Sequence, residues 1–285
     1  MVKVFFSLLV LFSLSYSEDA QIVEDSLVVE DPVVSKIKSF LDTQAYEENV
    51  DFINVIFDPK SDFYKNERVD SVKVVETLKE NGLLELFFKT PRELTLNFKT
   101  SGSPLFFVKL MGDTLRSMGY YRYVTTASHL DASEFTWNIN LTSEYATDPL
   151  ILETELNKSG CKIIDVERSS QTQWTYIIDM DSGFLNIKEL KSNEELNLKR
   201  SLYAHWLNVS QVNSVTIKSS RRNRWYPYIA YYDASLHLLK VVKSSEITQE
   251  IDLDIPQGSK YIKISDLYTL KNVRDELVIY PVGFR

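Results

Sequence analysis

Apolar residues at helical spacing dominate an early segment of the chain. In SKIKSFLDTQAYEEN (35–49) they recur every three or four positions, which predicts a helix with Ser35 as its N-cap. The short segment DFINVIF (51–57) predicts a strand. In VDSVKVVETLKEN (69–81) valine and leucine residues form one stripe, and the Asn-Gly step that follows is a typical helix exit, so we expect a second helix there.

The middle of the chain holds two units with the same order of signals. Each unit has an alternating strand, a capping residue followed by Pro and Leu, an amphipathic helix, Gly and a second strand. The first unit consists of ELTLNFKT (93–100), a helix from Ser103-Pro104-Leu105 to Gly119, and YYRYVTT (120–126). The second consists of FTWNINLTS (135–143), a helix from Asp148-Pro149-Leu150 to Gly160, and CKIIDVE (161–167).

Two successive strand–helix–strand units whose middle strands form a hairpin are typical of the ferredoxin-like split βαβ arrangement. The segment WTYIIDM (174–180) is expected to add a further antiparallel strand. The sequence therefore predicts an α+β fold that begins with a ferredoxin-like α/β sandwich domain, whose core covers residues 93–180.

Beyond residue 181 the pattern changes to short strands. A polar, turn-rich segment is followed by alternating segments that are separated by turn signals at roughly ten-residue spacing. This pattern is typical of an all-β sandwich or barrel. The segments are SLYAHWLNV, SVTIKSS, WYPYIAYYD, LHLLKVVK, EIDLDI, KYIKISDL and ELVIYPV.

The first residues have the three parts of a secretory signal. Lys3 precedes the apolar run Val4–Leu14, and Ser15-Tyr16-Ser17 offers small residues for cleavage. The run is shorter than the about 20 residues that span a bilayer, although a retained N-terminal anchor is the alternative. No later segment is long and apolar enough to span a membrane, so we expect a periplasmic protein without a transmembrane segment after signal removal.

These signals predict the following organisation. The chain divides into a signal peptide (1–17), an acidic tether or early edge strand (18–34), an α+β domain (35–181), a connector (182–195) and a β-sandwich domain of jelly-roll-like type (196–285).

The charge balance argues against some partners. The formal net charge of the whole chain is -8, and removal of Lys3 with the signal leaves -9. Nucleic acids attract clustered Lys and Arg, so an acidic chain does not favour them, nor does it favour an anionic lipid surface.

The chain contains one Cys and three His. Cys161, His129, His205 and His237 show no metal-ligand spacing, so we expect no metal site, and no sequence signal indicates a cofactor. Cys161 begins an apolar strand and is expected to be buried as a small hydrophobic residue. The alternatives are a disulfide between chains or a reactive thiol.

The stretch RRNRWYPYIAYYD (221–233) combines three Arg with five aromatic residues. At a strand period of two, one face holds Trp225, Ile229 and Tyr231, and the other holds Tyr226, Tyr228, Ala230 and Tyr232. A sandwich strand needs only one apolar face, so the other set is available for a ligand or a neighbouring segment. Pro227 lacks an amide donor and predicts an edge strand, or a bulge near the start of the strand.

Aromatic rings stack on the apolar faces of sugars, and Arg side chains bind hydroxyls or carboxylates. We therefore expect a contact surface here. The alternative is that the second face packs against another part of the chain and that the Arg side chains pair with nearby acids. The candidate ligand-binding residues are Arg222, Arg224, Trp225, Tyr226, Tyr228 and Tyr232.

Two resemblances extend this interpretation. IAYYDASLHLLKVV (229–242) followed by IDLDIPQGSKYIKIS (251–265) resembles the end of jelly-roll carbohydrate-binding or galactose-binding-like modules. The whole mature chain resembles an uncharacterised family of exported proteins from epsilon-class bacteria, which implies a periplasmic location but does not indicate an activity. The stretches that carry the second resemblance are ETLKENGLLELFF, SPLFFVKLMGDTLRSMGYYRY, FTWNINLTSEYATDP and NRWYPYIAYYD.

The chain also contains N-x-S/T tripeptides at Asn140, Asn157 and Asn208. Asn140 and Asn208 lie in strand-like runs, which makes them poor acceptors. Asn157 has Glu155 two positions before it, which resembles the extended acceptor sequence of bacterial N-glycosylation. Asn157 is therefore the candidate glycosylation site.

No segment carries a catalytic signature. G-x-S-x-G and a Gly-rich phosphate loop are both missing from the sequence, and Cys161 has no base nearby in sequence. Four carboxylates in the last third leave a hydrolase as a minor alternative, because glycoside hydrolysis needs a pair of them. They are Asp233, Asp252, Asp254 and Asp266.

The sequence thus predicts a non-catalytic periplasmic binding or adaptor protein that recognises a glycan or another envelope component through residues 221–232. The alternative is a structural subunit of an envelope secretion or motility complex. Such a subunit pairs with its protein partner through the edge of a sheet, and ELTLNFKT or WTYIIDM are the segments expected to provide that edge.

Overall fold

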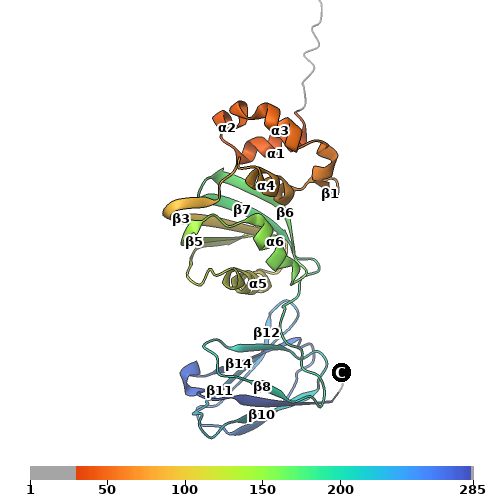
Figure 1. The fold of residues 1–285 in the computed structure, drawn as a ribbon. Helices are drawn as coiled ribbons and strands as arrows, with labels where there is room; N and C mark the ends of the chain where they lie inside the picture. Colours follow the sequence, from red (N-terminus) through yellow and green to blue (C-terminus); the bar gives the residue numbers. More distant parts are fainter. Residues whose placement is uncertain (1–29, 284–285) are drawn as a thin grey trace, which may run out of the picture. The chain divides into compact units, whose positions relative to one another are not determined.

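The structure is a computed structural model that describes residues 30–283 (Figure 1). The predicted signal peptide and residues 18–29 of the predicted tether lie outside these residues. The last three residues of the predicted tether, 32–34, are helical, so the tether prediction was wrong for them. All the helices and strands below belong to the compact unit Pro32–Arg285. Within residues 30–283, no helix has the length and apolar character that a membrane crossing requires.

The N-terminal elements are short helices, followed by a small hairpin and a longer helix. In chain order they are α1 (Pro32–Phe40), α2 (Thr43–Glu48), α3 (Val50–Ile56), the 3₁₀ turn η1 (Lys60–Phe63), β1 (Tyr64–Lys65), β2 (Arg68–Val69) and α4 (Ser71–Glu80). The helix α4 confirms the second predicted helix, and its N-cap Asp70 accepts a hydrogen bond from the Lys73 amide at 3.1 Å.

Two predictions for this part were wrong. The first predicted helix begins at Pro32 rather than Ser35 and breaks where Asp42 caps α2 by accepting from the Ala45 amide at 2.9 Å. DFINVIF is helical, since it forms α3 rather than a strand. Ile53 and Phe57, four positions apart, are buried on one helical face, and a helix satisfies its backbone polar groups without a neighbouring strand.

The two strand–helix–strand units are confirmed in their order. The elements are β3 (Phe87–Thr100), α5 (Pro104–Ser117), β4 (Val124–Leu130), β5 (Phe135–Tyr145), α6 (Pro149–Asn157), β6 (Lys162–Ser170) and β7 (Gln173–Asp179). The strand predicted at 120–126 begins only at Val124. Gly119 and Gly160 have φ values of +93° and +71° at the two helix exits, a conformation that glycine adopts at low cost.

These strands form one mixed sheet in the order β4-β5-β3-β7-β6 (Figure 1). β5 lies between β3 and β4 and is antiparallel to both. β7 enters between β3 and β6, parallel to β3 and antiparallel to β6. ELTLNFKT and WTYIIDM are therefore interior strands, so the prediction that they offer a free edge was wrong. The edges of this sheet are β4 and β6.

The C-terminal part consists of two antiparallel four-stranded sheets, in the orders β13-β10-β15-β8 and β12-β11-β14-β9. Its elements are β8 (Leu196–Leu198), β9 (His205–Asn208), β10 (Ser214–Ser219), β11 (Pro227–Tyr232), β12 (Leu238–Lys243), β13 (Glu250–Asp254), β14 (Tyr261–Asp266), the 3₁₀ turn η2 (Leu270–Asn272) and β15 (Leu277–Val282). Buried residues of both sheets form one cluster, which is consistent with a β-sandwich. The fold class is thus α+β.

Candidate ligand-binding surface

The stretch 221–233 forms β11 and the turn that precedes it. β11 is an interior strand, paired with β12 on one side and β14 on the other, so the prediction of an edge strand was wrong. Pro227 is tolerated because it is the first residue of the strand, where one missing amide interrupts little of the ladder. The irregularity in the ladder lies at the other end, between Tyr231 and Tyr232.

One face of this stretch belongs to the sandwich core. Trp225, Ile229 and Tyr231 are all 0% exposed. The Trp225 indole Nε1 donates to the Ser265 carbonyl oxygen at 2.9 Å, so its only polar group is satisfied internally. Burial, with a smaller contribution from Asp254, raises the pKa of Tyr231. Trp225 therefore supports the sheet from inside and does not reach a ligand, although it was among the candidate residues.

The other face is half-exposed, and its two ends differ. At one end Tyr232 lies against Trp206, with ring centroids 5.0 Å apart, and both rings pack against the larger hydrophobic core. Burial raises the pKa of Tyr232, and the neighbouring Tyr228 adds to this effect. Tyr232 is therefore partly used in packing, as the structural alternative for this face predicted.

At the other end the rings are more accessible. Tyr226 and Tyr228 are half-buried. The Tyr226 ring meets the ring of Tyr268 edge-on, with centroids 5.0 Å apart, and Tyr268 is 64% exposed. Tyr228 lies opposite Lys243 of β12 and Ser265 of β14. We call Tyr226, Tyr228 and Tyr268 the tyrosine surface.

Asp266 holds the tyrosine surface in place. This carboxylate is 8% exposed and accepts hydrogen bonds from the Tyr226 and Tyr268 amides, both at 2.9 Å. It also accepts from the Thr269 amide at 2.8 Å and from the Asn272 side chain at 3.0 Å. A carboxylate with four internal donors fixes the loop after β14.

Two of the other three candidate carboxylates, Asp252 and Asp233, also serve local contacts. Asp252 accepts from the Thr216 hydroxyl at 2.6 Å on the adjacent strand. Asp233 closes the turn after β11, where its carboxylate lies 2.9 Å from the His237 ring. Desolvation raises the pKa of Asp233, but hydrogen bonds from His237 and Ser235 outweigh it and leave the pKa below its usual value. Among residues 30–283, no group of three or more His, Cys, Asp and Glu side chains could hold a metal ion.

The turn before β11 carries the predicted Arg residues. Arg222 and Arg224 are exposed, and Asn223 between them is 3% exposed. The Asn223 side-chain oxygen accepts from the amides of Arg274 and Asp275, both at 2.8 Å. The turn is therefore attached to the loop before β15. Sequence reasoning missed Tyr268, Lys271 and Arg274, because only tertiary hydrogen bonds bring that loop to the turn.

The remaining sequence candidates lie in the N-terminal part. Cys161 is 0% exposed, which confirms its predicted burial, and this burial raises its pKa to about 11, with Asp179 adding to the shift. Asn157 is the last residue of α6 and is exposed. The Glu155 carboxylate bonds Lys158 and Ser117, and these hydrogen bonds lower its pKa.

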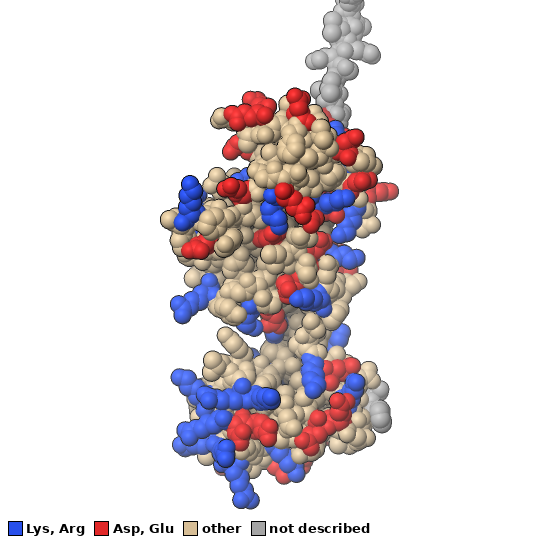
Figure 2. All heavy atoms as spheres, viewed as in Figure 1, with Lys and Arg blue, Asp and Glu red and all other residues tan. Residues whose placement is uncertain are grey.

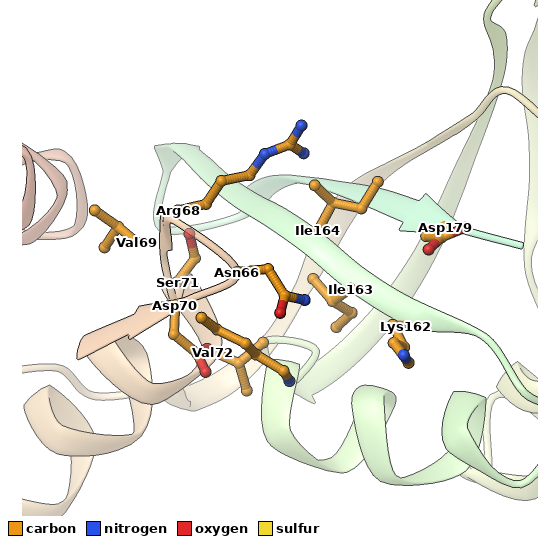
Figure 3. Close-up of a pocket in the computed structure, with 11 residues that line it drawn as sticks. Asn66, Arg68, Val69, Asp70, Ser71, Val72, Lys162, Ile163, Ile164 and Asp179 are labelled. Atoms are coloured by element: carbon orange, nitrogen blue, oxygen red, sulfur yellow. The ribbon is translucent and has the colours of Figure 1, made fainter. Parts of the chain in front are cut away.

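A small cavity of about 280 Å³ lies between the β1–β2 hairpin, the start of α4 and β6 (Figure 3). The Asn66 side chain points toward Ile163, and the Arg68 guanidinium points away from both. Two polar groups of its lining have internal partners, since Asp70 caps α4 and Lys65 pairs with Glu153 at 3.3 Å. None of the lining residues is aromatic, so the tyrosine surface is the better candidate site for a ligand that stacks on rings.

Comparison with known proteins adds no family to this description. No protein-family model matches the chain, and none of the curated proteins matches it.

Proposed function

We propose that this protein is a non-catalytic binding protein of the bacterial periplasm that recognises a glycan through the tyrosine surface. One observation carries this proposal: three tyrosine rings that the sandwich core does not need stand together on the outer side of an interior strand and its neighbouring loop. Rings of this kind stack on the apolar faces of sugars, and exposed aromatic groups indicate an interface.

The support beneath these rings favours binding. β11 is hydrogen-bonded on both sides, Trp225 fills the core behind it, and Asp266 fixes the backbone at Tyr226 and Tyr268. A surface that is already ordered loses little conformational entropy when a ligand binds, which improves affinity. The internal hydrogen bonds of Asp233, Asp252 and Asp266 favour a binding protein over a hydrolase.

The finer relationships belong to the same proposal. The β3–α5–β4 unit, with β5 inserted between its strands, supports a ferredoxin-like arrangement of the mixed sheet. The paired antiparallel sheets support a relationship to jelly-roll carbohydrate-binding modules. The periplasmic location rests on the signal-like residues 1–17 and on the resemblance to exported bacterial proteins.

The test measures binding to an array of polysaccharides, followed by titration calorimetry with the best ligand. Tyr226→Ala, Tyr228→Ala and Tyr268→Ala should each weaken binding by about 2- to 10-fold without changing the melting temperature. Tyr280→Ala is the matched control, because this exposed tyrosine lies on β15 of the other sheet. Wild-type protein that binds none of the polysaccharides, or tyrosine variants that bind as tightly as the control, would refute the proposal.

One observation favours the adaptor alternative. Every residue of the edge strand β4 is exposed, and Val124 and Leu130 are 67% and 62% exposed. Uncovered edge strands are templates for an added strand from another protein. If this edge binds an envelope protein, Ser128→Pro should remove that protein from a pull-down out of native periplasm, and Tyr228→Ala should not.

A further inference from the structure

Positive charge gathers at the end of the sandwich where the turn before β11 meets the loop that contains η2. We define the cation cluster as Arg221, Arg222, Arg224, Lys271 and Arg274. Segments 220–224 and 270–276 together hold these five cations and only two carboxylates, Asp275 and Glu276. The chain as a whole is acidic, with a formal charge of -8. Lys and Arg side chains gather on the left of the C-terminal part in Figure 2.

The two segments are held together by a buried bridge. Besides accepting from the Arg274 and Asp275 amides, Asn223 donates to the Glu276 carbonyl oxygen at 3.0 Å and to the Ser219 hydroxyl at 3.2 Å. The Ser220 hydroxyl donates to Asp275 at 2.8 Å. Since Asn223 and Arg274 are 51 positions apart, the fold itself places these cations together.

The charged groups of the cation cluster are not used in contacts within the described residues. All five are exposed, and none of them makes an ion pair or a cation–π contact with any residue from 30 to 283. Clustered like charges repel one another in the free protein. An anionic ligand relieves this repulsion, and arginine is well suited to bind carboxylate, sulfate or phosphate groups with two parallel hydrogen bonds.

The cluster continues directly into the tyrosine surface. Arg224 is two residues before Tyr226, and its amide donates to the Asn272 carbonyl oxygen at 3.0 Å. Lys271 is three residues after Tyr268, whose ring contacts Tyr226. The tyrosine surface and the cation cluster are therefore adjacent on both segments of the chain.

We infer that the ligand is an acidic polysaccharide and that the cation cluster binds its anionic groups while the tyrosine surface stacks on its sugar rings. This inference rests on the proposed function. The cluster is small and adjoins aromatic rings that stack on sugars, so it favours an acidic glycan over nucleic acid or an anionic lipid surface, which both favour a more extended basic surface.

The experiment uses the mature chain and measures dissociation constants at several NaCl concentrations. The probes are polygalacturonic acid for carboxylates, dextran sulfate for sulfates, a phosphomannan for phosphates and neutral dextran. The variants are R221Q/R222Q/R224Q and K271Q/R274Q. The matched control is K191Q/K199Q/R200Q, which removes three exposed cations from the same part of the chain.

We expect the wild type to bind at least one acidic polysaccharide more tightly than dextran and to lose affinity as salt rises. The triple Arg variant should bind it about 10-fold more weakly at low salt, with a smaller salt dependence, while the control triple variant binds as the wild type does. The acidic probe that binds best identifies the anionic group.

Three results would overturn the inference. They are equal affinity for acidic and neutral polysaccharides, equal losses in the cluster and control variants, and tighter binding to duplex DNA or to phosphatidylglycerol vesicles than to every acidic polysaccharide. Tyr228→Ala separates this inference from the proposed function. If only the tyrosine variant loses binding, the proposed glycan-binding surface is supported and the inference of an anionic ligand is refuted. If only the cluster variants lose binding, anion binding by the cation cluster is supported and glycan binding by the tyrosine surface is refuted.

Discussion

The N-terminal and C-terminal parts use their charges differently. In the N-terminal part ion pairs join separate elements: Lys79 of α4 lies 2.6 Å from Asp148 at the start of α6, and Lys36 of α1 lies 2.5 Å from Asp165 of β6. These charged side chains therefore hold separate elements of the fold together. In the C-terminal part the cation cluster makes no such pair with any described residue.

The difference follows from the interactions that fix neighbouring elements and turns in each part. Helices packed on a sheet leave long side chains near neighbouring elements, where Lys and Asp pair. The turns of the sandwich are instead fixed by uncharged or fully bonded side chains, such as Asn223 and Asp266, which bond to the backbone. Because the cations are not needed to hold these turns, they remain available for an external partner.

The largest expected effect tests whether the two cores are equally well packed. Trp225 of the sandwich and Trp174 of the mixed sheet are 0% and 1% exposed. Trp225→Ala and Trp174→Ala should each lower the free energy of unfolding by about 3–5 kcal/mol, because each leaves a large cavity. Urea denaturation measures this change. A Trp225→Ala variant that unfolds at the wild-type urea concentration would contradict the burial of this side chain.

The next effect concerns the bridge that gathers the cations. Asn223→Ala leaves the amides of Arg274 and Asp275 without their acceptor, and it should cost about 1–3 kcal/mol of stability. Binding to the acidic polysaccharide should weaken as well, since the two segments are no longer joined. The exposed Asn197→Ala is the control and should change stability by less than about 0.5 kcal/mol. Equal melting temperatures for the two variants would argue against the bridge.

A smaller effect compares Asp148, which forms an ion pair, with Arg222, which forms none with the described residues. Asp148→Ala removes both the Lys79 ion pair and the N-cap of α6, in which Asp148 accepts from the Leu150 amide at 2.9 Å, and should cost about 1–2 kcal/mol. Asp148→Asn keeps a capping oxygen and should cost less. Arg222→Gln should change the urea midpoint very little, by less than about 0.5 kcal/mol in stability. A larger loss for Arg222→Gln than for Asp148→Ala would reverse the comparison.

At mildly alkaline pH the smallest effect comes from Cys161 of the N-terminal part. Burial raises the pKa of Cys161 from 9.0 to about 11. As pH rises through this interval, the unfolded chain loses the thiol proton first, so the folded state should lose stability. Cys161→Ala should lack this part of the pH dependence in urea titrations. Native Cys161 should also resist iodoacetamide at pH 8 and react in urea; rapid native labelling would disprove its burial.

Local signals accounted for the elements that were predicted correctly. The capping residues followed by Pro, and the Gly exits, located α5 and α6. At α6 the cap is a local hydrogen bond from the Leu150 amide to Asp148, whereas the Ser103 hydroxyl before α5 donates to the distant Ser235 carbonyl oxygen. DFINVIF was misassigned because a short apolar run fits a strand or a helix equally well. Its tertiary surroundings decided that it is a helix, since Ile53 and Phe57 are both buried and lie on the same side only at helical spacing.

The candidate site was predicted in part. The period of two correctly separated Trp225, Ile229 and Tyr231 from Tyr226, Tyr228 and Tyr232. It could not tell which set faces the core, because both faces are aromatic. It also could not reveal Tyr268, Lys271 or Arg274, since these residues join the site through contacts with distant positions.

The sequence by itself determined the α+β class, the order of the strand–helix–strand units and the β-rich C-terminal part, because periodicity and caps are local properties of the chain. Only the tertiary structure decided that β11 is an interior strand, that Trp225 is a core residue and that five cations of an acidic chain stand together. Net charge is a sum over the chain, whereas a charged surface depends on which distant segments the fold brings into contact, and here the hydrogen bonds of Asn223 make that contact.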